Sequence, residues 1–122
     1  MDMLHLVQLQ DAPWRPHPTI AGVQTKVFEG REVNPLADAF LAQVAPNGEI
    51  PWHVHDQASE TAYVLEGQGL LLYAPDAEHR QTQQAALVPG CVFTVRTGVW
   101  HSVKNRETEP LVLFACHTPP TL

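Results

Sequence analysis

Cysteines, basic side chains and long apolar runs are all scarce in this chain of 122 residues. The two cysteines, Cys91 and Cys116, are too few for a disulfide framework, and their spacing does not match a zinc ribbon or a thioredoxin-type motif. We therefore expect two reduced, buried thiols. No apolar run approaches the roughly 20 residues of a membrane-spanning helix. The first six residues also lack the pattern of a secretory leader. These absences predict a cytoplasmic protein that does not bind a membrane.

The charged residues are mostly acidic. Seven Lys and Arg stand against thirteen Asp and Glu, which gives a formal net charge of −6. Nucleic acids and anionic lipid surfaces both require a basic surface, so this balance argues against either as a partner. The apolar fraction of 44% and the charged fraction of 16% are typical of a folded domain. The length predicts one domain over residues 1–122.

Proline and glycine, by contrast, are frequent. Eleven prolines and seven glycines divide the sequence into short apolar runs, which is the pattern of an all-β sandwich or barrel. The runs of strand length are Leu4–Leu9, Val23–Glu29, Ala39–Ala45, Ile50–His55, Glu60–Leu65, Gly69–Tyr73, Ala85–Val88, Val92–Val95, Trp100–Lys104 and Leu111–His117.

The run at 39–45 has a competing interpretation. Asn34-Pro35 can begin a helix, because Asn is a good N-cap and Pro is favoured at the first helical position. Leu36, Phe40 and Val44 then fall on one helical stripe, and the intervening alanines favour a helix. Local propensity alone therefore favours a helix over a strand in this segment.

Three histidines and one glutamate form a pattern that suits a metal ion. His53 and His55 are two positions apart, so in a strand both point to the same face, about 7 Å apart. Glu60 begins the next apolar run, and His101 begins a later one. Three imidazoles and one carboxylate suit divalent manganese, iron, nickel, copper or zinc. His-x-His alone is equally consistent with two solvated histidines on a half-exposed strand.

The spacing of these residues resembles the two sequence motifs of the cupin superfamily. Residues 48–67 contain Gly48, His53-Val54-His55, Glu60 and Gly67, at nearly the spacing of the first motif. Residues 90–105 contain Gly90, Gly98, His101 and Asn105, at the spacing of the second motif. The gap before His53 is one residue short, Arg96 replaces the usual proline, and Cys91 replaces a common acidic residue. None of these departures removes a family ligand position.

The resemblance implies an all-β fold, a double-stranded β-helix or jelly roll that forms a sandwich or barrel. It implies that His53, His55, Glu60 and His101 hold one divalent metal ion, whose identity stays open. It also favours a strand over 39–45, because the family has a strand just before the first motif. Family members commonly dimerise, and Leu4–Leu9 is a candidate for pairing with a partner, so we expect a homodimer.

Strand alternation extends the prediction from the metal ligands to a pocket. Counting by twos from Glu60 and His101 turns Ala62, Val64 and Val103 inward. Further candidates for the lining, whose faces the sequence does not fix, are Phe40, Tyr73, Phe93, Val95 and Phe114. Trp52 and Trp100 neighbour ligands and should face away from the pocket. His5, His17 and His79 are expected at the solvated surface. His117 ends the last run within reach of a pocket, but we do not assign it to the site.

Two functions are compatible with this site. The first is a metalloenzyme of dioxygenase or isomerase type, which acts on a small organic molecule at an open metal position. The alternative is a module that binds or senses a small molecule without turning it over. No residue is identified as catalytic, and neither the substrate nor the reaction follows from the sequence.

Overall fold

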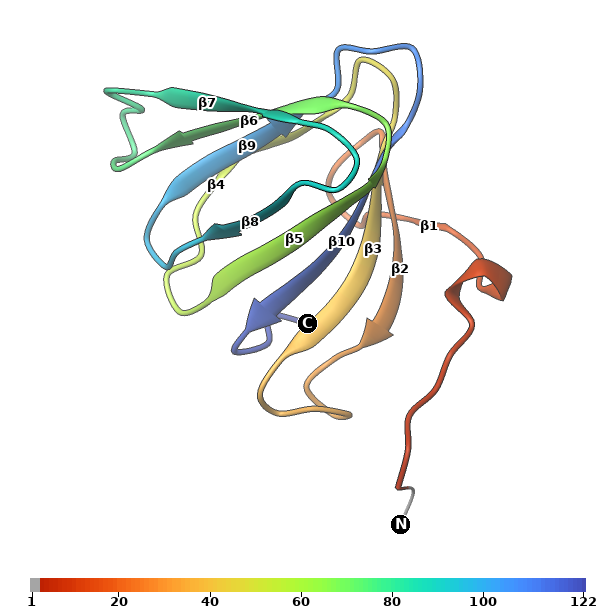
Figure 1. Cartoon of the computed structure of the whole chain (residues 1–122). Helices are drawn as coiled ribbons and strands as arrows, with labels where there is room; N and C mark the ends of the chain where they lie inside the picture. Colours follow the sequence, from red (N-terminus) through yellow and green to blue (C-terminus); the bar gives the residue numbers. More distant parts are fainter. Residues whose placement is uncertain (1–2) are drawn as a thin grey trace.

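Two antiparallel sheets face each other in the computed structural model, which describes residues 3–122 (Figure 1). Met1 and Asp2, which the single-domain prediction includes, lie outside the described residues. The larger sheet has the order β1 (Arg15–Pro16), β2 (Val23–Glu29), β3 (Asp38–Val44), β10 (Leu111–Thr118), β5 (Ser59–Glu66) and β8 (Val92–Val95). The smaller sheet has the order β4 (Glu49–His53), β9 (Trp100–Lys104), β6 (Gly69–Ala74) and β7 (Gln83–Leu87).

The predicted all-β jelly roll is confirmed, but the barrel is not closed. The six-stranded and the four-stranded sheets are separate hydrogen-bonded units, so the fold is a sandwich. Three of its strands carry both the core and the polar residues discussed below. In β10, Leu111 and Leu113 are buried in the core, and His117 lies on the same face further along the strand. Likewise Val64 follows Glu60 in β5, and Val103 follows His101 in β9.

The disputed segment at 39–45 is a strand. β3 pairs with β2 on one side and with β10 on the other, so nearly every residue of β3 has a neighbour in both strands. A helix in this position would break both ladders and leave their backbone groups unpaired. Pairing between strands therefore overrides the local preference for a helix.

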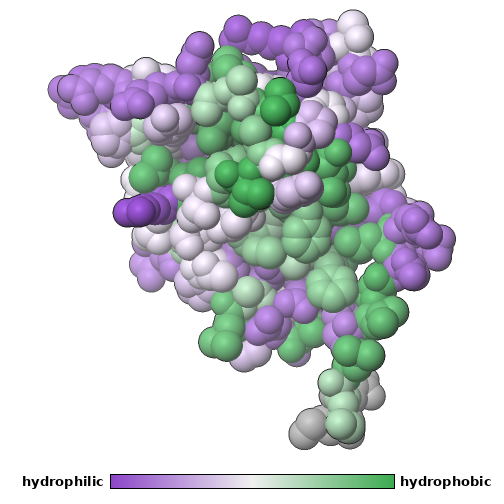
Figure 2. All heavy atoms as spheres, viewed as in Figure 1, coloured by the Kyte–Doolittle hydropathy of each residue, from purple (hydrophilic) through white to green (hydrophobic). Residues whose placement is uncertain are grey.

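The strand predicted at Leu4–Leu9 is wrong. Residues 3–8 form no strand, although the Nε2 of His5 lies 2.7 Å from the carbonyl oxygen of Phe28 in β2. The chain then enters a short 3-10 helix, Leu9–Asp11 (Figure 1). β1, which was predicted as loop, already pairs with β2 at the edge that such a strand would need. The unpaired segment leaves Leu4 74% exposed and Leu6 71% exposed. Its apolar side chains stand out from the body in Figure 2.

The structure agrees with the expectation of two reduced, buried cysteines only in part. Cys91 and Cys116 are free thiols, as expected, but both are half-buried instead of fully buried. No helix among residues 3–122 is both long and apolar enough to cross a membrane.

Candidate metal centre

The four side chains selected from the sequence come together between the two sheets. His53 ends β4, His55 follows it by two residues, Glu60 lies in β5 and His101 in β9. The pairing of β4 with β9 sets His53 directly opposite His101. One potential ligand atom from each of the four residues lies within 4.8 Å of all the others. His101 is buried, whereas the other three side chains are partly accessible.

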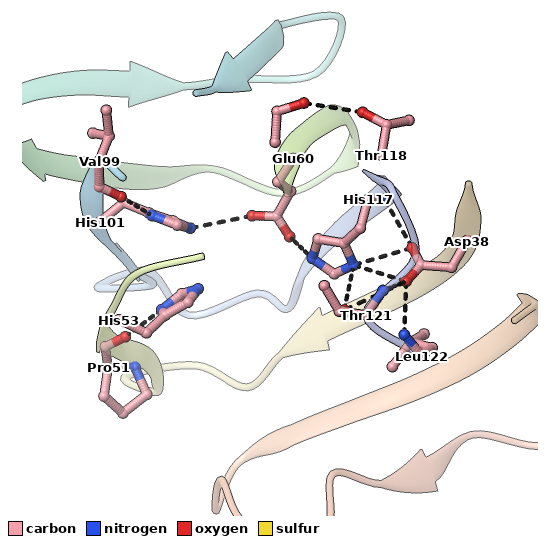
Figure 3. Close-up of polar contacts among 11 residues, drawn as sticks. Asp38, Pro51, His53, Glu60, Val99, His101, His117, Thr118, Thr121 and Leu122 are labelled. Atoms are coloured by element: carbon pink, nitrogen blue, oxygen red, sulfur yellow. Dashed lines mark hydrogen bonds and ion pairs between the residues drawn. The ribbon is translucent and has the colours of Figure 1, made fainter. Parts of the chain in front are cut away.

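Backbone carbonyls fix the orientation of two of these imidazoles (Figure 3). The Nδ1 of His53 lies 2.8 Å from the carbonyl oxygen of Pro51, and the Nδ1 of His101 lies 3.0 Å from that of Val99. A carbonyl only accepts, so each Nδ1 carries the hydrogen. In the neutral rings, the lone pair is then on Nε2. Histidines that bind metals are commonly held in this way through the ring nitrogen that does not bind.

Two further observations fit a cation at this position. The Nε2 of His101 is 3.3 Å from Oε1 of Glu60, and a lone pair facing a carboxylate requires a proton or a metal cation between them. The Nε2 of His55 is buried without a hydrogen-bond partner. A buried nitrogen without a partner is costly, and coordination would satisfy it. Three imidazoles and a carboxylate therefore fit a divalent transition metal.

The local electrostatics favour the protonation states that bind metals. Burial lowers the pKa of His53, and it lowers the pKa of His55 to about 4, so both rings are neutral at pH 7. Burial on its own would raise the pKa of Glu60, but the contacts with His101 and His117 outweigh it and keep the carboxylate ionised. The neutral imidazoles of His53 and His55 and the ionised carboxylate of Glu60 can bind a cation without first losing a proton.

His117 belongs to this cluster, although the sequence analysis did not assign it to the site. Its Nε2 lies in ion-pair contact with Oε2 of Glu60, at 3.0 Å, and its Nδ1 lies 3.0 Å from both carboxylate oxygens of Asp38 (Figure 3). Burial would lower the pKa of His117, but Glu60 and Asp38 outweigh it and raise the pKa. The signal was available as strand parity, because His117 shares its face with Leu111, Leu113 and Ala115.

Asp38 anchors this chain of contacts. Its side chain is completely buried and accepts hydrogen bonds from the backbone N–H groups of His117, Thr121 and Leu122, at 2.8 to 3.0 Å. With the imidazole of His117 and the hydroxyl of Thr121, the carboxylate thus has five donors. Asp38 therefore fixes both the ring of His117 and the last residues of the chain beside the site.

A cavity of about 520 Å³ opens from the four side chains. Of the predicted lining residues, the structure places Phe40, Ala62, Phe93 and Val103 on its wall, and Val64, Tyr73, Val95 and Phe114 elsewhere. Val64 packs in the hydrophobic core. Tyr73 turns its hydroxyl toward Gln83 of β7, to which it donates a hydrogen bond. Val95 is buried, and Phe114 alternates with the inward residues of β10, so it faces outward.

Trp52 and His79 also differ from their predicted positions. Trp52 lines the cavity, because the pairing of β4 with β9 shifts register between Ile50 and His53 and breaks the simple alternation. His79 is half-buried and stacks on Trp52, with ring centroids 3.8 Å apart. His17, which was expected at the surface, lines the cavity. Arg96 is exposed and does not line it.

Comparison with known proteins identifies the family. The model of the Cupin domain matches residues 40–117, nearly two thirds of the chain, and includes both motifs. This chain belongs to the cupin family. Germin-like protein 5-1 of Oryza sativa subsp. japonica is 37% identical over 79 residues, which cover 65% of this chain and 34% of the relative. A probable germin-like protein of Arabidopsis thaliana, subfamily 2 member 5, is 39% identical over 71 residues, which cover 58% of this chain and 32% of that protein. The cupin chain thus spans about a third of the length of these relatives.

Solved cupin structures share the fold over most of the chain. A predicted oxalate decarboxylase from Thermotoga maritima superposes with a TM-score of 0.79 at 18% identity, over 93% of this chain and 98% of that one. KdgF from Halomonas sp. superposes with a TM-score of 0.73 at 16% identity, over 90% of each chain. At such identities the similarity establishes the fold and not the activity.

Proposed function

We propose that this chain is a single-domain, metal-dependent cupin that acts on a small organic molecule. His53, His55, Glu60 and His101 would hold one divalent ion. The observation that carries the proposal is the set of four donor atoms within 4.8 Å of one another, at the wall of a cavity of about 520 Å³. A bound divalent metal supplies Lewis-acid polarisation of a ligand oxygen or, if it is redox-active, electron transfer with dioxygen.

The residues of the chain prepare this site before any ligand arrives. The carbonyls of Pro51 and Val99 hold the hydrogens of His53 and His101 on Nδ1, so Nε2 is the nitrogen of each ring that would bind a metal. The carboxylate of Glu60 reduces the net charge of a divalent centre to +1. The apolar walls limit access of bulk water, which strengthens electrostatic interactions inside the cavity. His117 keeps a hydrogen on Nδ1, directed at Asp38.

One observation favours the alternative of a binding or sensing module. The polar groups near the proposed metal are either ligands themselves or, like His117, engaged with a buried carboxylate. Among the described residues that line the cavity, the only titratable side chain outside this cluster is His17, whose Nδ1 already accepts backbone N–H groups. Tight binding of a small molecule without turnover would favour this module, whereas oxygen consumption or carbonyl isomerisation would favour the enzyme.

The first experiment is elemental analysis of untagged protein, together with the double variant His53→Ala, His101→Ala. The matched control is His5→Ala, which removes a histidine that does not line the cavity. We expect about one transition-metal ion per chain in the wild type and in the control, and its loss in the double variant. Manganese, iron or nickel would direct assays to oxygen and carbonyl chemistry, whereas zinc would favour Lewis-acid chemistry. Absence of metal after reconstitution would reject the proposed function.

A further inference from the structure

The polar groups of the cavity are concentrated at one end. His53, His55, Glu60, His101 and His117 lie at the metal end, where β4, β5, β9 and β10 meet. The remaining wall comes largely from β2, β3 and β10, with apolar side chains at Val23, Val27, Phe40, Ala42 and Leu113, and from Ile20 just before β2. A ligand that fills the cavity would therefore meet polar groups at one end and apolar side chains along most of its length.

No Lys or Arg side chain lines this cavity, although all seven lie within the described residues 3–122. Several are engaged elsewhere. Lys104 pairs with Glu49, Arg80 pairs with Asp76, and Lys26 donates to the carbonyl of Leu9. A ligand with a second anionic group, such as a dicarboxylate, a sugar acid or a phosphate ester, would bury that charge against apolar walls. Burial of an unpaired charge is strongly unfavourable.

The few polar side chains of the apolar wall offer little to a polyhydroxylated ligand. The Nδ1 of His17 accepts the backbone N–H groups of Thr19 and Ile20, both at 3.1 Å. The hydroxyl of Thr121 lies within hydrogen-bond distance of His117 and Asp38. Thr25 is the further hydroxyl on this wall. A sugar needs many more partners than these when it is desolvated.

We infer that the ligand of this cavity has one oxygen-bearing head, which binds at the metal, and an uncharged apolar body, aromatic or branched aliphatic. This inference deepens the proposed function and rests on it for the head. The volume of about 520 Å³ lies within the range of cavities that enclose drug-sized ligands, which is about 300–1,000 Å³. A ligand as small as oxalate would leave most of the apolar wall without contact.

Two probes with the same metal-binding head and different bodies test the inference. Acetohydroxamate and 2-naphthohydroxamate are titrated calorimetrically into protein loaded with cobalt(II), with oxalate as a third ligand. Burying roughly 100 Å² of additional apolar surface corresponds to about 70-fold tighter binding. We therefore expect the naphthyl probe to bind on the order of 50- to 100-fold more tightly than acetohydroxamate, and more tightly than oxalate.

Variants then place the preference in this cavity. Ala42→Phe fills the apolar wall and should remove most of the naphthyl preference while acetohydroxamate binding changes less than about threefold. Because Ala42 is buried and this variant can misfold, Val27→Trp provides a second test at a side chain on the cavity wall that is 53% exposed. The matched control is Val92→Trp, the same substitution at a valine that is 61% exposed and does not line the cavity. This control should bind both probes like the wild type.

The outcomes separate this inference from the proposed function. If the metal binds and both hydroxamates bind equally, or oxalate binds more tightly than the naphthyl probe, the inference is overturned and the metal site stands. If no metal binds, the proposed function fails, and the same titrations are run on metal-free protein. There a naphthyl preference that Val27→Trp removes would support the apolar cavity, and its absence would overturn it.

Discussion

Replacing Asp38 should cost more stability than any change to a surface carboxylate. The Asp38 side chain is completely buried and has five donors: the ring of His117, the hydroxyl of Thr121, and the backbone N–H groups of His117, Thr121 and Leu122. Asp38→Ala removes the acceptor and leaves the imidazole of His117 without its carboxylate partner. Removing one member of a buried pair typically costs about 3–5 kcal/mol. Thr121 and Leu122 are exposed and can bind water instead, so we expect about 3 kcal/mol.

Urea unfolding of metal-free protein at pH 7, followed by tryptophan fluorescence, measures this loss. The control is Asp76→Ala, because Asp76 forms an i,i+4 ion pair with Arg80 at the surface and such pairs contribute about 1 kcal/mol or less. A loss for Asp38→Ala below about 1 kcal/mol, or equal to that of the control, would refute the reasoning from burial and hydrogen bonding. Asp38→Asn keeps one oxygen acceptor and should fall between the two.

Three further predictions concern the same region and the N-terminal segment. Replacing His117 with Leu should weaken metal binding about 10- to 100-fold, because Oε2 of Glu60 loses its partner. His117→Gln should recover part of this loss. Competition with a chelator measures the affinity, and an unchanged affinity in His117→Leu would contradict the prediction. The stability difference between wild type and Asp38→Asn should be largest between pH 3.8 and 6.5. Hydrogen bonds outweigh burial and lower the pKa of Asp38, so its contribution to stability is lost below this window, as the carboxylate protonates. The pKa of His117 is raised, so its contribution to stability is lost above the window, as the ring deprotonates. A flat pH profile would be inconsistent with this coupling. Light scattering should give a dimer that dissociates when residues 3–8, with their exposed leucines, are deleted, and a monomeric full-length chain would disprove the predicted homodimer.

The sequence was sufficient for the fold and for the group of four polar residues because both depend on spacing. Two histidines at i and i+2, a glutamate at the start of the next run and a histidine at the start of a later one are brought together once the strands pair. Trp52 and His117 were misjudged for different reasons. The register shift between Ile50 and His53 is a property of the pair β4 and β9 and has no local signal. The side chain of His117 points inward, as strand alternation predicts. Its partner Asp38 is 79 residues away in the sequence, so the contact between them has no local signal.

The segment at 39–45 shows that strand pairing can override a local preference for a helix. Alanines and an Asn-Pro start favour a helix, yet the segment is the central strand between β2 and β10. The failed strand at Leu4–Leu9 is the reverse case, because its alternating leucines suit a strand but no partner is available within the described chain. In both segments the presence of a pairing partner decided the structure, and pairing is a long-range property that propensity does not contain.

The cytoplasmic location stays a prediction.

The arrangement of core and site on the same strands links stability to metal binding. β5, β9 and β10 each carry a buried aliphatic residue and a polar site residue on one inward face, so packing at Val64, Val103 and Leu111 fixes the spacing of Glu60, His101 and His117. A rigid frame is what a site of four converging donors requires, because it holds the donors at the spacing that a metal ion needs. Metal at 100 times its dissociation constant would return about 2.7 kcal/mol of stability by mass action. The metal-free chain should accordingly be the less stable form, and core substitutions should weaken metal binding without touching a ligand.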